Sequence, residues 1–256
     1  MSVACRSERS RQYQRTKLED ALRFPWKGEQ NVETILIGGV LSLLGVFFIP
    51  TLFVYGYLVR VIRQVAAGDD ELPPVFDEWG ELLVDGVLAF AISLVYFLVP
   101  AIVITVGVLA WILPVGVGTS VGGTGGNSVA VLGVLLALAT AAVGLITLLA
   151  AVYLFPAAIA AFARTGSFGA AFSPSLLRRI GTDGDYAVAW LIAIVIGVIA
   201  QIVAGAVAIT VLGLVLVPFV TFYGNIASAY AIGRGIESVP LPDEQSEESA
   251  TGQPAV

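Results

Sequence analysis

Histidine is absent from this chain, cysteine occurs once, and charged residues are scarce. Only 12% of the 256 residues are charged, whereas soluble domains carry roughly a quarter. The single thiol, Cys5, excludes a disulfide within the chain and has no imidazole to activate it. These absences remove most acid–base and metal chemistry. The sequence therefore predicts no catalytic residue, no metal site, no cofactor and no enzymatic activity.

Three long apolar runs make up more than half of the chain. The runs Thr34–Val59, Val87–Ala163 and Tyr186–Gly233 contain no Asp, Glu, Lys or Arg. A hydrocarbon core of ~30 Å takes about 20 apolar helical residues per crossing. The runs are therefore predicted to span a membrane rather than to form a globular core. The predicted fold class is an all-α, polytopic integral membrane helical bundle.

The lengths of the runs predict about five transmembrane helices, with six as the alternative, and interfacial amphipathic helices beside them. The last run would measure ~70 Å as one straight helix, so it must turn, near Thr210–Gly213. The Gly-rich stretch Pro114–Ser128 is predicted to be a flexible external loop. The predicted membrane domain covers residues 18–235, with spans at about 32–65, 82–113, 129–163, 186–209 and 211–233.

The two ends of the chain differ from the middle. Residues 1–17 are polar and Arg-rich, and we expect a disordered basic tail or translated sequence upstream of the true start, in preference to a nucleic-acid-binding arm. Residues 236–256 are expected to form a disordered acidic tail. Two Lys against eleven Arg, with 19 acids against 13 bases, indicate a halophilic source.

The distribution of bases orients the chain. Bases flank the first and third predicted loops and follow the last span, so these parts are expected in the cytoplasm of a multi-pass protein of the cell membrane. The bases before Thr34 should also lie inside, which conflicts with a single crossing by residues 32–65. That segment either folds back at Pro50 as a hairpin or crosses once, with the N-terminus outside.

An internal repeat favours the single crossing, because a copy of the last span should run in the same direction. Five identities occur at identical spacing in the two copies. The repeated residues are Leu44, Gly45, Pro50, Tyr55 and Gly56 in the first copy and Leu212, Gly213, Pro218, Tyr223 and Gly224 in the second. The prolines of the predicted spans, Pro50, Pro156 and Pro218, are expected to break their helices.

A few polar residues lie within the predicted spans. Gln201 stands four residues from both Gly197 and Gly205, a spacing that lets a second helix approach and bond to the amide. Thr221, Asn225 and Ser228 form a second polar stripe. Two interpretations stay open: these residues hold helices together, or they line a path for a solute.

The cytoplasmic loops hold the remaining candidates. Helical periodicity places Phe76 and Trp79 on one face of an interfacial helix, and the acidic residues Asp77, Glu78 and Glu81 on the other. A metal site formed by these acids is the less favoured alternative. We expect Arg178 and Arg179 of the third loop to pair with the acidic face. The expected partners are membrane lipid and a protein at this cytoplasmic face, with no nucleic acid; the oligomeric state is not predicted.

Five stretches carry a family resemblance: Leu18–Pro25, Ile37–Gly39, Gly56–Arg60, Pro74–Leu82 and Gly184–Trp190. With them the chain resembles the domain of unknown function 4013 family, uncharacterised multi-pass membrane proteins common in haloarchaea. The resemblance covers about Leu18–Gly235. It implies an integral membrane protein and supplies no catalytic residues.

The sequence favours a non-enzymatic membrane scaffold or assembly component. The alternative is a transporter or channel component for a small neutral solute, which would use discontinuous helices around Gln201 and Asn225. A membrane enzyme would need its chemistry in the loops. A water-accessible cavity that reaches Gln201 would favour the transporter, and a packed bundle there would favour the scaffold.

Overall fold

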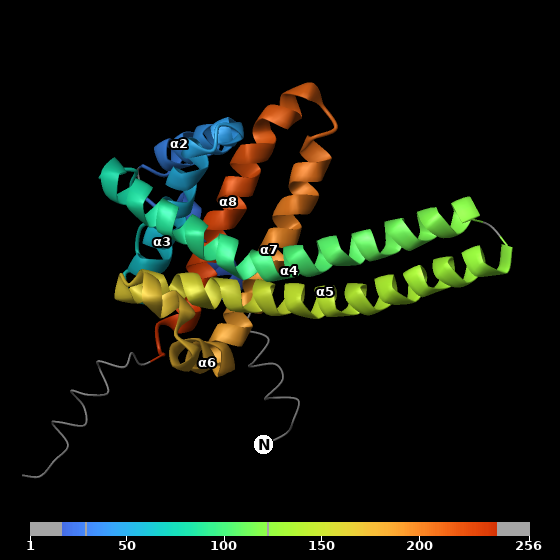
Figure 1. Cartoon of the computed structure of the whole chain (residues 1–256). Helices are drawn as coiled ribbons and strands as arrows, with labels where there is room; N and C mark the ends of the chain where they lie inside the picture. Colours follow the sequence, from blue (N-terminus) through green and yellow to red (C-terminus); the bar gives the residue numbers. More distant parts are fainter. Residues whose placement is uncertain (1–16, 29, 122, 240–256) are drawn as a thin grey trace, which may run out of the picture. The chain divides into compact units, whose positions relative to one another are not determined.

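The computed structural model describes residues 17–28, 30–121 and 123–239, in which every regular element is helical (Figure 1). This confirms the all-α fold class. The expected tails lie outside the described residues, with two exceptions. Residue 17 belongs to a helix that is described over 17–23, and residues 236–239 form the end of α8 and the turn after it. After this first helix come η1 (Phe24–Trp26), α2 (Asn31–Leu43), η2 (Leu44–Val46), α3 (Ile49–Ala66), α4 (Trp79–Val121), α5 (Gly123–Thr165), η3 (Phe168–Phe172), α6 (Pro174–Thr182), α7 (Gly184–Val207) and α8 (Val211–Ile236).

The chain divides into two compact units. The first unit holds residues 1–90 and 156–256, and the second holds residues 91–155. In the described residues, four helices are long and apolar enough to cross a membrane, namely α4, α5, α7 and α8. The chain is therefore a membrane protein. The sequence predicts about five spans, one more than these four helices. The difference lies in residues 32–65, which form two short helices, α2 and α3, instead of one long one.

The segment made of α2 and α3 folds back on itself. Its two ends lie together, because the Nζ of Lys27 donates to the backbone oxygen of Asp70 over 3.1 Å. Phe24, before the segment, also contacts Tyr230 near the C-terminal end of α8, with ring centroids 4.4 Å apart. A single crossing is therefore wrong, and the hairpin alternative is the one that forms. Pro50 occupies the first turn of α3 and starts a new helix there.

The second half of this hairpin runs parallel to α8, as the internal repeat predicts. Tyr57 of α3 lies 5.6 Å from Phe222 of α8 between ring centroids. Further along both helices, a methyl group added to Gly233 would lie 2.8 Å from the Cβ of Val65. The direction that the repeat predicts is correct for α3. It is wrong for α2, which runs antiparallel to α3.

Helices α7 and α8 form an antiparallel hairpin (Figure 1). Thr210 caps the start of α8, because its hydroxyl accepts a hydrogen bond of 2.9 Å from the backbone N–H of Gly213. Glycines of α8 let the two backbones approach: a methyl on Gly224 would lie 2.6 Å from the Cβ of Ala200, and one on Gly235 would lie 2.3 Å from that of Ala189. The 48-residue apolar run therefore folds as two helices joined at residues 208–210.

The second unit is a hairpin of α4 and α5. The helices are antiparallel, because Gly107 faces Thr140 and Gly133 faces Pro114. Helix α4 continues to Val121 and α5 begins at Gly123, so the predicted flexible loop is almost entirely helical. Serine hydroxyls bond back to the preceding turn in both arms, from Ser120 to Gly116 over 2.8 Å and from Ser128 to Thr124 over 3.0 Å.

The predicted helix breaks at two prolines are also wrong. Pro156 lies inside α5 and Pro218 lies inside α8, and both helices continue past them. Membrane helices tolerate proline where neighbouring helices and side chains satisfy the freed carbonyl groups. The carbonyl that loses its backbone donor at Pro218 is that of Leu214, whereas the Thr221 hydroxyl donates one turn back in the same helix, to the Val217 carbonyl oxygen over 2.9 Å.

Candidate functional site

Two glycines set how α3 crosses the beginning of α4. A methyl group on Gly56 would lie 1.9 Å from the carbonyl oxygen of Leu82, and one on Gly86 would lie 1.8 Å from that of Leu52. The backbones therefore touch. The buried face of α4 in this unit passes through Leu82 and Gly86 to Ala89, whereas Trp79 keeps 45% of its surface exposed.

The stretch Phe76–Val87, for which the periodicity predicts a separate interfacial helix, does not form one: its first three residues are not helical, and the rest is the beginning of α4. Helix α4 begins only at Trp79 and continues into the long apolar helix. Phe76 precedes it and stacks on Tyr57, with ring centroids 4.3 Å apart and planes 11° apart. The Tyr57 hydroxyl donates to the backbone oxygen of Pro74 over 3.0 Å. The loop thus folds onto α3, because the aromatic stack offers Phe76 more contact than an open surface does.

The acids of this stretch pair with arginines of α3. The Arg60 guanidinium, whose side chain is 15% exposed, bonds to the carboxylate of Asp77 and lies 3.3 Å from that of Glu78. The sequence favours Arg178 and Arg179 of α6 as the partners of these acids. The partner in the structure is Arg60 instead. The loop returns along the last turns of α3 and places Asp77 and Glu78 beside Arg60.

Arg63 joins three helices. Its Nη1 lies 2.8 Å from the Asp85 carboxylate of α4, and its Nε donates to the Ala163 carbonyl of α5 over 3.0 Å. Glu81 lies in the first turn of α4, where the helix dipole stabilises a negatively charged carboxylate. In the part of the chain that the structure describes, no three His, Cys, Asp or Glu residues gather as metal ligands.

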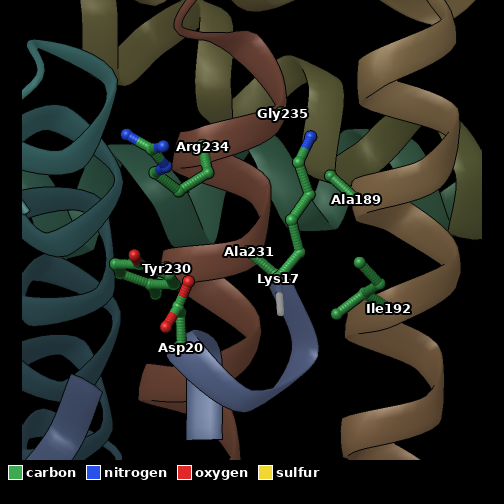
Figure 2. Close-up of a pocket in the computed structure, with 8 residues that line it drawn as sticks. All are labelled: Lys17, Asp20, Ala189, Ile192, Tyr230, Ala231, Arg234 and Gly235. Carbon is green, nitrogen blue, oxygen red and sulfur yellow. The ribbon is translucent and has the colours of Figure 1, made fainter. Parts of the chain in front are cut away.

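A second polar cluster lies where the first helix meets α7 and α8. Figure 2 shows Asp20 beside Tyr230 of α8, and the Lys17 side chain extending past Ala189 toward Gly235. The Lys17 Nζ lies 3.3 Å from the Asp185 carboxylate of α7. The Tyr230 hydroxyl donates to the Asp70 carboxylate over 3.1 Å, and Arg234 lies 3.5 Å from the same carboxylate. The cavity between these side chains measures about 40 Å³, far below the ~300–1,000 Å³ of small-molecule sites. The cluster therefore fixes the first helix and leaves no room for a substrate.

The polar residues of the spans do not come together as one group. Ser228 donates across the helix pair to the Ala193 carbonyl over 3.3 Å, and Thr221 donates within its own helix. Gln201 and Asn225 are exposed. A methyl group added to Gly197 or Gly205 would meet nothing within 4 Å. The flank of α7 that carries Gln201 is therefore open, while Ser228 faces α7.

An apolar groove was missed by the sequence analysis. It measures about 460 Å³ and follows the seam between α7 and α8, so we call it the seam groove. Its walls come from four segments: Leu22 and Trp26, Ile35 of α2, and residues of α7 and α8. No local sequence pattern marks such a site, because each segment contributes only ordinary apolar residues. Arg60 and Arg63 were missed as partners as well, although their spacing of three on α3 is a readable signal.

Comparison with known proteins identifies the family of this chain. No curated protein and no solved structure matches it. Residues 40–209 match a family model, and this region holds the whole of α3, α4, α5, α6 and α7. The chain therefore belongs to the family described as "Protein of unknown function (DUF4013)".

Proposed function

We propose that this protein is a non-enzymatic scaffold or assembly component of the cell membrane, and that it binds another transmembrane helix through one flank of α7. The observation that carries the proposal is the open flank formed by Gly197, Gln201 and Gly205, which we call the Gln201 notch. The residues stand four apart and so lie on one side of the helix.

The Gln201 notch has room for a second helix and contains the side-chain amide of Gln201, which is unpaired in the part of the chain that the structure describes. Both glycines face open space, and Gln201 is exposed. Within the described residues its side chain has no hydrogen-bond partner. At 1.5 Å per residue, Gln201 lies about 24 Å along α7 from Asp185, well inside a helix that is apolar enough to span a membrane. Lipid chains offer an amide neither a donor nor an acceptor.

Binding of a second helix would satisfy this amide. Interhelical hydrogen bonds in membranes contribute about 0.6 kcal/mol on average and up to ~2 kcal/mol. Small residues on both sides let two backbones approach closely, which adds van der Waals contact. A primary amide is both donor and acceptor, so it can pair with a polar side chain or a backbone carbonyl of the partner.

The placement of the other polar residues supports assembly over solute transport. Among the described residues, no hydrogen bond joins Gln201 to Thr221, Asn225 or Ser228, which a solute path would bring together. Ion-coupled transport usually requires an ionisable group inside the membrane, and the uncharged runs contain none. Two of the acids that an enzyme would need free are paired instead, Asp77 with Arg60 and Asp85 with Arg63.

Site-specific photocrosslinking in native membranes tests the proposal. A photoreactive amino acid at position 201 is expected to crosslink to protein, whereas one at Val195, exposed on another side of α7, is expected to label lipid. Gln201→Leu should also shift the protein to a smaller species on native gels. If position 201 labels lipid only and Gln201→Leu leaves the native species unchanged, the assembly proposal is wrong.

A further inference from the structure

The seam groove lies on the other flank of α7 from the Gln201 notch. Its α7 wall is formed by Ile196, Ile199 and Val203, together with Ala200. These residues stand at intervals of three and four, so the groove runs along the helix axis for about 10 Å. Lipid chains in a bilayer run in the same general direction as a spanning helix.

The lining is apolar along the groove and polar at one end. No charged side chain lines it. The two polar groups are the Tyr223 hydroxyl, which already donates to the Leu22 carbonyl, and the indole N–H of Trp26. The Trp26 ring lies 6.2 Å from the Tyr223 ring and is 57% exposed. A groove of this kind matches an apolar chain that carries hydrogen-bond acceptors at one end.

Size decides which occupant fits. The groove measures about 460 Å³, within the ~300–1,000 Å³ range of small-molecule sites. A helix of ~10 Å diameter would occupy about 800 Å³ over the same 10 Å length, so a helix of a partner or of a second copy of this chain would lie across the mouth of the groove rather than within it. The only small residues in the lining, Ala200 and Gly224, already contact each other. A single hydrocarbon chain is narrow enough.

We propose that the seam groove binds one hydrocarbon chain of a membrane lipid, with the oxygen atoms of the lipid at the end where Trp26 lies. Helices α7 and α8, which form the seam, are long and apolar enough to span a membrane, so lipid chains are the medium that reaches this groove. The indole N–H donates to a lipid oxygen, as tryptophans at membrane interfaces do. This site lies apart from the Gln201 notch and does not depend on it.

Native mass spectrometry of the full-length protein, released from its own membranes in mild detergent, tests the proposal. The wild type is expected to keep one lipid per chain through a delipidation series. Val203→Trp fills the groove from α7 and should lower the retained lipid at least fivefold. Ile202→Trp adds the same ring to a neighbouring position that is 67% exposed and does not line the groove, so its retention should equal that of the wild type.

Two further variants keep the test decisive. Val220→Trp fills the groove from α8, so the expected loss can be measured even if Val203→Trp does not fold. Trp26→Phe keeps an aromatic ring and removes the N–H donor, so it should weaken retention without abolishing it. Equal retention in the folded groove-filling variants and Ile202→Trp would overturn the proposal. So would a wild type that loses all lipid as readily as those variants, or one that carries a polypeptide in place of the lipid.

Discussion

The crossing of α3 and α4 permits a sharp prediction about Gly86. Substitution by alanine would place a methyl carbon 1.8 Å from the Leu52 carbonyl oxygen, where observed contacts are not closer than 3.0 Å. The two backbones must therefore separate by at least 1.2 Å, since 3.0 minus 1.8 leaves that gap. A backbone carbonyl within a helix cannot rotate away as a flexible side chain would.

The expected cost of Gly86→Ala is about 3 kcal/mol, the upper end for overpacking a core. Separation of the helices would also strain the neighbouring ion pair between Arg63 and Asp85, which spans 2.8 Å. The measurement is the detergent fraction at half-unfolding when sodium dodecyl sulfate is titrated into purified protein in mild micelles. Loss of helical ellipticity reports the transition.

Gly80→Ala in the first turn of the same helix is the matched control. A methyl group there meets nothing within 4 Å, so the better helix propensity of alanine should leave stability unchanged or raise it by up to ~1 kcal/mol. If Gly86→Ala unfolds at the same detergent fraction as the wild type and Gly80→Ala, the backbones of α3 and α4 do not touch at Gly86.

Three further predictions use the same purified protein or its membranes. Arg63→Gln should destabilise the folded protein by about 1–3 kcal/mol, since it leaves the Asp85 carboxylate, whose side chain is 16% exposed, without its ion pair. Arg23→Gln breaks an exposed pair with Glu19 and should cost under ~1 kcal/mol in the same titration. Equal effects of the two variants would contradict this. Phe76→Ala should cost about 2 kcal/mol, less than the ~3–5 kcal/mol of a fully buried phenylalanine, and should alter the near-ultraviolet circular dichroism; an unchanged spectrum would refute the stack on Tyr57. Reporters fused to the two ends should be active on the same side of the membrane, because the α2–α3 segment folds back; activity on opposite sides would restore the single crossing.

Length and composition predicted the parts of the fold that depend on one stretch of chain. The uncharged run Tyr186–Gly233 is too long for one crossing. The helix length, calculated from the rise per residue, exceeds the thickness of a membrane, so a turn within the run is required. The direction of α3 was readable from the repeat. The direction of α2 was not, because the decisive contact joins Lys27 to Asp70, 43 residues later.

Contacts between distant segments account for the remaining errors. The acids Asp77 and Glu78 had several arginines available, and only the return of the loop along α3 selects Arg60. Gly56 and Gly86 look like ordinary small residues in sequence, since nothing in either helix shows that they meet. Breaks were expected at Pro156 and Pro218 because proline interrupts helices in soluble proteins. In membrane helices the freed carbonyl groups can be satisfied by neighbouring segments, and both helices continue past the prolines.

The contacts of the first helix have a consequence for how the protein is made. The Leu22 carbonyl receives its hydrogen bond from Tyr223, 201 residues later, and Lys17 meets Asp185 after 168 residues. At a synthesis rate of ~5–20 residues per second, the Leu22 carbonyl waits about 10–40 s before Tyr223 is synthesised. During that interval Phe24, fully buried in the finished protein, lacks the Tyr230 ring of α8, whose centroid lies 4.4 Å from that of Phe24. The last two helices to be translated are thus the ones that complete the fold of the first.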